Sequence, residues 1–367
     1  MNARDAYIAL NLMEGIGPVR VRALSETLGS LQAIFEAGRD DLLRAPGLGP
    51  TQATAILTQR SRLPWREEQD RVEALGARLV TPADPDYPKP LTHIHDPPLA
   101  LYVQGTLLPA DRKAVAIVGS RHATPYGRDT ADAFARQLAG VGFTVVSGLA
   151  RGIDTAAHHA TLKAGGRTLA VLGGALDRLY PEENRALADA IAQQGAVISE
   201  FPLGRAPDRT TFPMRNRIVS GLSLGVLVIE AGATSGALIT AGQALDQGRS
   251  VFAVPGRIDS PAARGSNRLI KNGAKLVDAL DDILEDFEYL IAPKPGGSAR
   301  APATALPPLT DPEQQIVSAL IDGERSMDEL SRQTGLTAAA MSVLILGLEM
   351  KRVVRLLPGR LVALRRG

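Results

Sequence analysis

Between residues 111 and 290, short apolar segments alternate with helical ones, and this alternation limits the folds open to the chain. Near-continuous apolar strands separated by helices are typical of a parallel sheet covered on both faces. Because crossovers between such strands are right-handed, we predict an α/β fold with a doubly wound (Rossmann-like) parallel sheet, whose ligands bind at the carboxyl ends of the strands. The predicted strands are Ala114–Val118, Thr144–Ser147, Thr168–Leu172, Ala196–Ser199, Gly225–Ile229 and Ser250–Val254, and the predicted helices are Gly127–Val141, Asp154–Ala164, Glu182–Gln194, Pro213–Leu222 and Ala237–Gln247.

The composition is that of a folded protein with more than one domain. The chain has 367 residues, of which 45% are apolar and 22% charged, enough for two or three cores. The absence of cysteine excludes disulfides, thiolate metal sites and a cysteine nucleophile. A formal net charge of +2 is not that of a basic nucleic-acid coat, so any anion site has to be local. We see no leader peptide and no apolar run of ~18 residues, which predicts a cytoplasmic protein without a membrane span.

Residues 1–65 are predicted to form a small helical domain of the helix-hairpin-helix (SAM-like) type. Two glycine-hinged turns, Gly15-Ile16-Gly17 and Pro46-Gly47-Leu48-Gly49-Pro50, each precede a helix. Amides at such a helix start can hold a DNA phosphate, but a tight turn without a ligand explains the same residues. The predicted helices are Ala6–Met13, Val21–Leu28 and Gln52–Gln59.

Two segments are rich in proline, which disfavours both helices and central strands. Residues 66–110 are predicted to be a connecting segment, with a helix at Glu67–Leu75 and a short strand at Arg78–Val80. Residues 291–310 lack apolar periodicity and are predicted to be a flexible linker.

Residues 311–367 are predicted to form a winged-helix domain, since three helices precede a hairpin. The third helix carries almost no polar side chain that could contact base edges. A winged helix that binds protein therefore remains as good an interpretation as one that reads DNA. The predicted elements are the helices Pro312–Ile321, Met327–Thr334 and Thr337–Met350 and the hairpin strands Val353–Leu357 and Leu361–Leu364.

Small residues and arginines recur where the predicted strands end. Gly119-Ser120-Arg121 follows the first strand, and Ser147-Gly148 begins a loop that reaches Arg151 and Asp154. Gly173-Gly174 and the segment from Gly232 to Gly236 follow two further strands. Such loops let an anion approach the backbone amides at a helix start, and an arginine adds a charged fork. Each loop alone is also explained as an ordinary strand-to-helix turn, with Asp154 as the N-cap of its helix.

An arginine-rich stretch with one aromatic side chain lies between the fourth and fifth strands. Arg209 and Phe212 precede the string Arg215-Asn216-Arg217. Guanidinium groups hold phosphates in a planar fork, and an aromatic ring can stack on an unpaired base. The sequence therefore predicts a receptor for a polyanion. The candidate nucleic-acid-binding residues are Gly119, Ser120, Arg121, Ser147, Gly148, Arg151, Arg209, Phe212, Arg215, Asn216, Arg217, Ser235, Gly236 and Lys271.

Other chemistries have weaker support. The chain contains neither Gly-x-Gly-x-x-Gly nor a P-loop string, so no nucleotide cofactor is predicted. His93 and His95 lack a third ligand, so no metal site is predicted, and His158 is expected to be a packing residue. Glu200 and Glu230 could be catalytic carboxylates, but no nucleophile or metal cluster accompanies them. We predict a binding protein and not an enzyme.

Taken together, these strings resemble the DNA-processing protein A (DprA/Smf) family. The resemblance covers the 80–290 region, in order and at fitting spacings. It departs from the family pattern at Gly173-Gly174, where a threonine or other polar residue often stands beside a glycine, and at Gly242, where a larger polar residue is common. The matching strings include Gly119-Ser120-Arg121, Ser147 to Asp154, Tyr180-Pro181 with Asn184, Phe212-Pro213 with Arg215-Asn216-Arg217, and Ser235 to Ala241.

The resemblance implies a protein that binds single-stranded DNA and protects it in natural transformation. It also implies loading of the RecA recombinase onto DNA covered by single-strand-binding protein, with no required cofactor and no catalytic turnover. Carried onto this chain, the phosphate pocket would use Gly119, Ser120 and Arg121. Arg209 would hold a phosphate, and Phe212 would stack on a base.

One alternative is an enzyme, a nucleoside-monophosphate phosphoribohydrolase of the lysine-decarboxylase-like group. That group carries a Pro-Gly-Gly-x-Gly-Thr-x-x-Glu string, which the segment from Glu230 to Gly236 lacks. The assembly state is also open to prediction. The strand Ser250–Val254 lies near an edge of the sheet by sequence order, and the apolar residues from Leu269 to Val277 are expected on a helix and a short strand beyond it. An uncovered edge or apolar patch there predicts a two-fold homodimer. Packing of Ile270 and Leu276 on their own sheet is the other interpretation.

Overall fold

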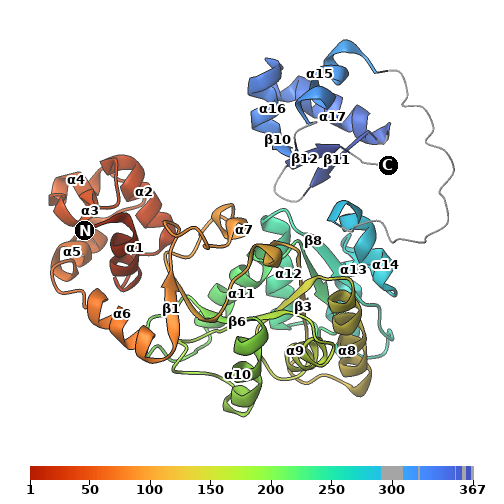
Figure 1. The fold of residues 1–367 in the computed structure, drawn as a ribbon, viewed down its shortest axis with the longest axis horizontal. Coiled ribbons are helices and arrows are strands. Elements are labelled where there is room, and N and C mark those ends of the chain that lie inside the picture. The colour runs from red at the N-terminus through yellow and green to blue at the C-terminus, as the bar shows by residue number, and fades with distance from the viewer. Residues whose placement is uncertain (291–308, 321–322, 352, 358–360, 365–367) are drawn as a thin grey trace. The chain divides into compact units, whose positions relative to one another are not determined.

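The computed structural model describes residues 1–290, 309–320, 323–351, 353–357 and 361–364. Its main feature is a nine-stranded sheet formed by the described residues, in the order β1-β2-β6-β5-β4-β3-β7-β8-β9 (Figure 1). The strands are β1 (Ala77–Val80), β2 (Leu101–Gly105), β3 (Ala114–Val118), β4 (Thr144–Ser147), β5 (Thr168–Val171), β6 (Ala196–Ser199), β7 (Gly225–Val228), β8 (Ser250–Ala253) and β9 (Lys275–Leu276).

The centre of the sheet is parallel, which confirms the predicted doubly wound fold. From β3 the chain adds β4, β5 and β6 in turn on one side, and then crosses to place β7 and β8 on the other. Strand β3 therefore pairs in parallel with both β4 and β7. The strand order thus reverses between β3 and β7, which is where a doubly wound sheet opens a crevice for ligands.

Helices cover both faces of this sheet. Alternate side chains of a strand point to opposite faces. Ala170 of β5 belongs to the apolar core beneath α10, whereas Leu169 and Val171 belong to the core beneath α11 and α12. Figure 1 shows α8, α9 and α10 on one side of the sheet and α11 and α12 on the other. Their bounds are α8 (Pro125–Gly140), α9 (Ile153–Lys163), α10 (Arg185–Gln194), α11 (Thr211–Gly221) and α12 (Gly236–Asp246).

The segment 66–110 extends the sheet instead of only connecting two domains. Strand β2 pairs antiparallel with β6, from Tyr102 opposite Ser199 to Gly105 opposite Ala196, and β1 pairs antiparallel with β2. The hydroxyl of Tyr102 donates to Glu68 Oε1 at 3.0 Å and thereby ties α6 (Trp65–Ala74) to β2. The prolines lie in the long turn between the two strands, which contains only the short helix α7 (Lys89–Thr92).

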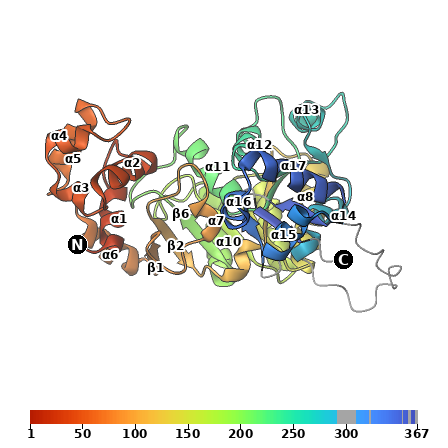
Figure 2. The ribbon, with the colours of Figure 1, turned by 90° about the horizontal axis from the view of Figure 1, so that it is seen from above.

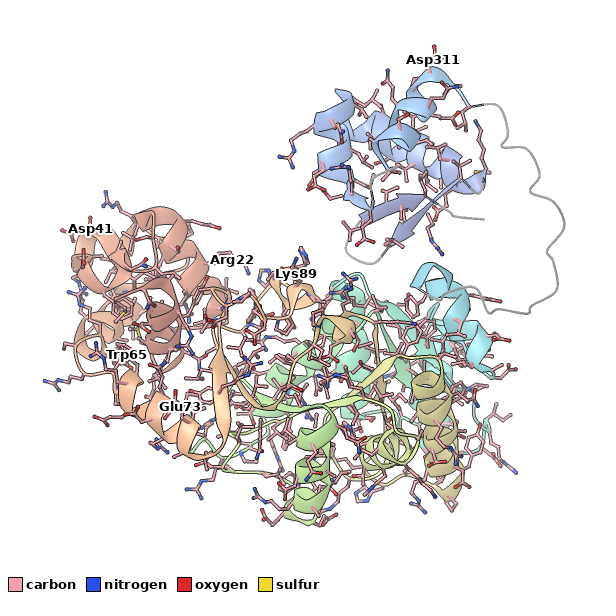
Figure 3. The ribbon with its side chains drawn as sticks, in the orientation of Figure 1. Arg22, Asp41, Trp65, Glu73, Lys89 and Asp311 are labelled. Carbon is pink, nitrogen blue, oxygen red and sulfur yellow. The ribbon has the colours of Figure 1, made fainter. Side chains whose placement is uncertain are left out.

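The N-terminal helices gather at the β1 end of the sheet (Figures 1 and 2). Gly17 and Gly49 precede α2 and α5, each of which begins with a proline. Arg22, labelled in Figure 3, donates to the carbonyl oxygen of His95, and Asn11 Nδ2 donates to the carbonyl oxygen of Glu200 at 3.2 Å. The helices are α1 (Ala3–Asn11), α2 (Pro18–Leu28), α3 (Ala33–Glu36), α4 (Arg39–Leu43) and α5 (Pro50–Gln59).

Beyond β8, α13 (Arg264–Lys271) leads into β9, which pairs in parallel with β8. The helix and the short strand expected after Ser250–Val254 are therefore present, and β8 lies one strand from the edge of the sheet, as predicted. Helix α14 (Leu280–Leu284) follows β9. Most of the predicted linker, residues 291–308, lies outside the described residues.

The C-terminal unit is a winged helix with its own apolar core. Met341, Ile345 and Leu348 of the third helix face that core, whereas Val343 and Met350 are exposed. The short strand β10 was not predicted, and it pairs with β12. Residues 358–360, the predicted turn of the hairpin, lie outside the described residues. The elements are α15 (Asp311–Ala319), β10 (Arg325–Ser326), α16 (Met327–Thr334), α17 (Ala338–Met350), β11 (Val354–Leu357) and β12 (Leu361–Leu364).

Among the described residues, no single helix is long and apolar enough to cross a membrane. One pair, α16 with α17, passes the same test of length and composition when taken together, but the two helices are bent by 109° at their junction.

Candidate nucleic-acid interface

A cavity of about 470 Å³ opens at the carboxyl ends of β3, β4 and β7, where the strand order reverses. Its lining comes from the loops that follow these three strands, from α11 and from the start of α12. The lining includes Gly119, Ser120, Arg121, His122, Gly148, Ala150, Asp154, Arg209, Phe212, Arg215, Asn216, Thr234, Ser235, Gly236, Ile239 and Thr240. Ten of the fourteen residues predicted from the sequence are in this lining. We call this space the first cavity.

The loop after β3 can take its path only because glycines let neighbouring backbones approach it. A Cβ atom on Gly119 would lie 2.5 Å from the Ile153 side chain, and one on Gly152 would overlap the carbonyl oxygen of Ser120. Gly152 also has a φ of +77°, which L side chains rarely adopt. The amide of Ile153 donates to the Ser120 carbonyl at 3.2 Å, so α9 begins directly against this loop.

Asp154 holds the loop after β4 in place. Its Oδ2 accepts from the amide of Gly148 at 3.1 Å and from the amide of Ala150 at 3.3 Å. Between them Leu149 has the left-handed φ of 56°. The expected role of Asp154 as an N-cap is wrong, because α9 begins at Ile153 and the carboxylate reaches back to the preceding loop. Burial raises the pKa of Asp154, and the nearby Arg215 opposes this shift.

Arg215 forms the floor of the first cavity. Its guanidinium donates to the carbonyl oxygen of Gly148 at 2.5 Å and to that of Val171. Gly148 has to be a glycine here, since a Cβ would lie 2.5 Å from that guanidinium. Burial lowers the pKa of Arg215 to about 10, so the group stays charged at neutral pH. The buried charge adds to the positive potential of the cavity.

Arg121 and Phe212 face each other at the mouth of the cavity. The Arg121 guanidinium carbon lies 4.6 Å from the centroid of the Phe212 ring, and the Tyr180 ring lies 6.1 Å from the Phe212 ring in a tilted arrangement. Gly173 packs against Phe212, because a Cβ there would lie 2.5 Å from Phe212 Cδ1. Arg121 and Arg209 are both exposed, and neither guanidinium has a hydrogen-bond or ion-pair partner in the described part of the chain.

Four predicted residues lie outside the first cavity. Ser147 is buried and donates its hydroxyl to the Ile117 carbonyl at 2.6 Å. Arg151 is paired with Glu183 through two hydrogen bonds of 2.8 Å. Lys271 is exposed at the end of α13.

The fourth predicted residue outside the cavity, Arg217, forms a buried ion pair with Glu200, whose Oε2 lies 2.6 Å from Nη2. It also pairs with Asp96 at 2.7 Å. Residues two apart on a helix do not share a face, which is why Arg217 points away from the cavity that Arg215 lines. Both glutamates considered as catalytic groups are engaged as well, because Glu230 accepts from the amide and hydroxyl of Thr124 at 2.9 and 2.6 Å.

Several lining residues were not predicted. Ile239 and Thr240 line the cavity three and four positions after Gly236, the spacing that places residues on one face of α12. That helical spacing was the sequence signal from which both residues could have been predicted. His122 had no such signal beyond its position beside Arg121. Within the residues that the structure describes, no cluster of three or more histidines and carboxylates is arranged to hold a metal ion.

A family model described as DNA recombination-mediator protein A matches residues 78–288, more than half of the chain. The chain belongs to this family. Models of the DprA winged-helix domain and of a SAM-like helix-hairpin-helix tandem match residues 300–360 and 8–60. These matches confirm the predicted resemblance and the types of both flanking domains.

Relatives and solved structures agree with this assignment. The chain is 34% identical to Protein Smf of Synechocystis sp. over 98% of each chain. It is 45% identical to DNA processing protein DprA of Bacillus subtilis over 58% of this chain and 72% of that one. DNA processing protein A of Streptococcus pneumoniae superposes with a TM-score of 0.68 at 33% identity, over 78% of this chain and 98% of that one. The Helicobacter pylori protein, described for its single-stranded DNA binding mode, has a TM-score of 0.53 at 30% identity, over 58% and 97%.

Proposed function

We propose that this protein binds single-stranded DNA in the first cavity without regard to base sequence. The observation that carries the proposal is the pairing of Arg121 with Phe212 beside amide-rich loops at the switch point of the sheet. A guanidinium and backbone amides recognise a phosphate, which every nucleotide has. An aromatic ring can stack on any base, provided that the base is not already stacked inside a duplex.

The two exposed arginines of the first cavity, Arg121 and Arg209, support the same location. Arg151, Arg205 and Arg257 on the surface each face a carboxylate within 2.8 Å. The exposed Arg121 and Arg209 have no such neutralising partner among the described residues. Their charge is therefore available to an incoming phosphate, and Arg215 adds a buried positive charge below them. A locally positive cavity on a chain of net charge +2 fits a strand-binding site better than a general basic surface.

The finer parts of the proposal concern biology and partners. We propose that the protein acts in the cytoplasm, in natural transformation and recombination, and that it protects incoming DNA. It would load RecA onto DNA covered by single-strand-binding protein. We propose that it acts without a cofactor and without catalytic turnover. The two glutamates considered as catalytic groups, Glu200 and Glu230, accept hydrogen bonds from Arg217 and Thr124.

A homodimer is also part of the proposal. Leu276 is 43% exposed on β9, the last strand in the sheet order, and could be covered by a second copy of the chain. The two cavities of a dimer could then bind one DNA strand together, which would raise the overall affinity for DNA without any new interaction. Light scattering of the full chain at tens of micromolar tests this part, and a monomer that binds DNA normally would exclude the dimer.

Titration with single-stranded and double-stranded oligonucleotides of equal length at two salt concentrations tests the central proposal. We expect tighter binding of the single strand and a linear dependence of log K on log salt. Equal affinity for the duplex would contradict it. A second assay follows RecA filament formation on DNA covered by single-strand-binding protein. Incubation with AMP provides the enzymatic comparison, because release of free adenine would favour the phosphoribohydrolase alternative.

A further inference from the structure

A second cavity, of about 590 Å³, lies beside the first and shares two of its residues. Arg121 and His122 line both spaces. Arg128 and His159 contribute the other basic side chains of the second cavity, from α8 and α9. The remaining lining consists of small or neutral residues such as Gly152 and Thr155, and none of the lining residues carries a carboxylate.

The basic side chains of this second cavity have hydrogen-bond donors left for an anion. In the described part of the chain, His122 and His159 have no side-chain hydrogen bond or ion pair. The Arg121 guanidinium lies 4.6 Å from the centroid of the Phe212 ring and has no hydrogen bond or ion pair among the described residues. Arg128 donates one N–H to the Ala123 carbonyl at 2.6 Å, which anchors the guanidinium and leaves its other donors. Elsewhere on α8, Arg136 is instead paired with Asp132.

The walls of the second cavity belong to ordered elements. Thr155 and His159 are four positions apart and share one face of α9, and α8 and α9 pack against each other. The start of α8 is fixed by Thr124, whose hydroxyl accepts from the Gly127 amide at 3.1 Å and donates to Glu230. The start of α9 is fixed against the Ser120 carbonyl. A ligand therefore meets a site that is already formed.

We propose that the second cavity binds the phosphodiester next to the one held in the first cavity, on the same DNA strand. This inference rests on the function proposed above and deepens it. Arg121 lies between the two phosphates and contacts both. Arg128 and His159 hold the second phosphate, and the strand continues across the start of α9.

The test uses the full chain and oligothymidines of increasing length. The double variant Arg128→Gln with His159→Gln removes two basic side chains of the second cavity, Arg209→Gln weakens the first, and Arg136→Gln removes the same charge from α8 outside either cavity. We expect the double variant to lower the slope of log K against log salt by about 0.7 on long oligothymidines. That change corresponds to about fivefold weaker binding at 0.1 M salt. The shortest oligothymidine that wild type binds should bind equally well, Arg136→Gln should match wild type, and Arg128→Lys should retain the slope.

Failure of this inference and failure of the proposed function give different results. If wild type does not bind single strands, or if Arg209→Gln binds as tightly as wild type, the function proposed for the first cavity is wrong. If Arg209→Gln weakens binding but the double variant keeps the wild-type slope and melting temperature, only the second site is wrong. Competition between inorganic phosphate and DNA shows whether the second cavity binds free phosphate or the phosphodiester of a DNA strand. A double variant that loses phosphate binding but keeps its DNA slope marks a site for free phosphate and overturns the proposal.

Discussion

The guanidinium of Arg121 covers one face of the Phe212 ring at a distance of 4.6 Å. A base that stacks on Phe212 from that side has to displace the guanidinium or stack on it in turn. The ring attracts the cation and so restricts its position before DNA arrives. Phosphate binding and base stacking at this site are therefore coupled through two side chains that already touch.

Replacing Arg121 with alanine should weaken the binding of every single-stranded sequence to a similar degree. Removing one charged partner of a phosphate should lower the slope of log K against log salt by about 0.7. Binding of oligothymidine and of mixed-sequence oligonucleotides at several salt concentrations measures this. Arg136→Ala is the matched control, because that arginine is paired with Asp132. An unchanged slope in a normally folded Arg121→Ala protein would exclude Arg121 from the site.

Phe212→Ala should cost about 1–3 kcal/mol of DNA affinity if the ring stacks on a base. If the ring instead supports the fold, the free energy of unfolding should fall by about 3–5 kcal/mol. Measuring both quantities distinguishes the two roles. A loss of stability with unchanged affinity would argue against stacking.

Gly173→Ala tests the position of the same ring without removing it. The new Cβ would lie 2.5 Å from Phe212 Cδ1, so the ring has to move. We expect weaker DNA binding in the direction of Phe212→Ala. Gly140→Ala is the control, since a Cβ there meets no atom within 4 Å outside the backbone of its own helix and its chain neighbours. Wild-type affinity in Gly173→Ala would show that the exact ring position is unimportant.

Arg217→Leu should destabilise the protein by about 3–5 kcal/mol, because it leaves the buried Glu200 carboxylate without its partner. The double variant Arg217→Leu with Glu200→Leu should recover part of this loss. Urea unfolding measures the stability, and DNA titration of the folded variants should show wild-type affinity. A DNA-binding defect in a stable double variant would show that Arg217 takes part in DNA binding after all.

Stability should depend on His158 below neutral pH. Burial lowers the pKa of His158 to about 3, whereas an unfolded histidine titrates near 6.5. The unfolded chain thus takes up a proton that the folded chain does not. As pH falls below about 6.5, the free energy of unfolding should fall by about 1.4 kcal/mol per pH unit on this account. Between pH 6.5 and 5, wild type should lose about 1.6 kcal/mol more than His158→Gln. Parallel stability curves for the two proteins would contradict this assignment.

The central sheet could be predicted because its strands carry their own signal. Ala114–Val118 is fully buried and apolar at every position, as a parallel central strand requires. Strands β1 and β2 were not assigned to the sheet, since the pairing of Gly105 with Ala196 joins residues far apart in sequence. No local sequence pattern indicates which distant strand will be the partner.

The site was predictable where chemistry and backbone coincide, as in Gly119-Ser120-Arg121. The site was not predictable where the partner of a side chain depends on the direction in which the helix points it. Arg215 and Arg217 look equivalent in sequence, yet the geometry of α11 places Arg215 at the cavity and Arg217 against Glu200. Arg128 and His159 line one cavity only because two helices pack together.

The antiparallel addition of β2 to β6 determines where this protein can be shortened. A fragment that starts at residue 111 keeps every strand from β3 onward but removes the hydrogen-bonding partner of β6 from Ala196 to Ser199. The bare backbone groups of β6 would then be open to pairing with other chains, so we expect such a fragment to aggregate. A fragment that starts at Trp65 retains α6, β1 and β2, and should remain dispersed in solution.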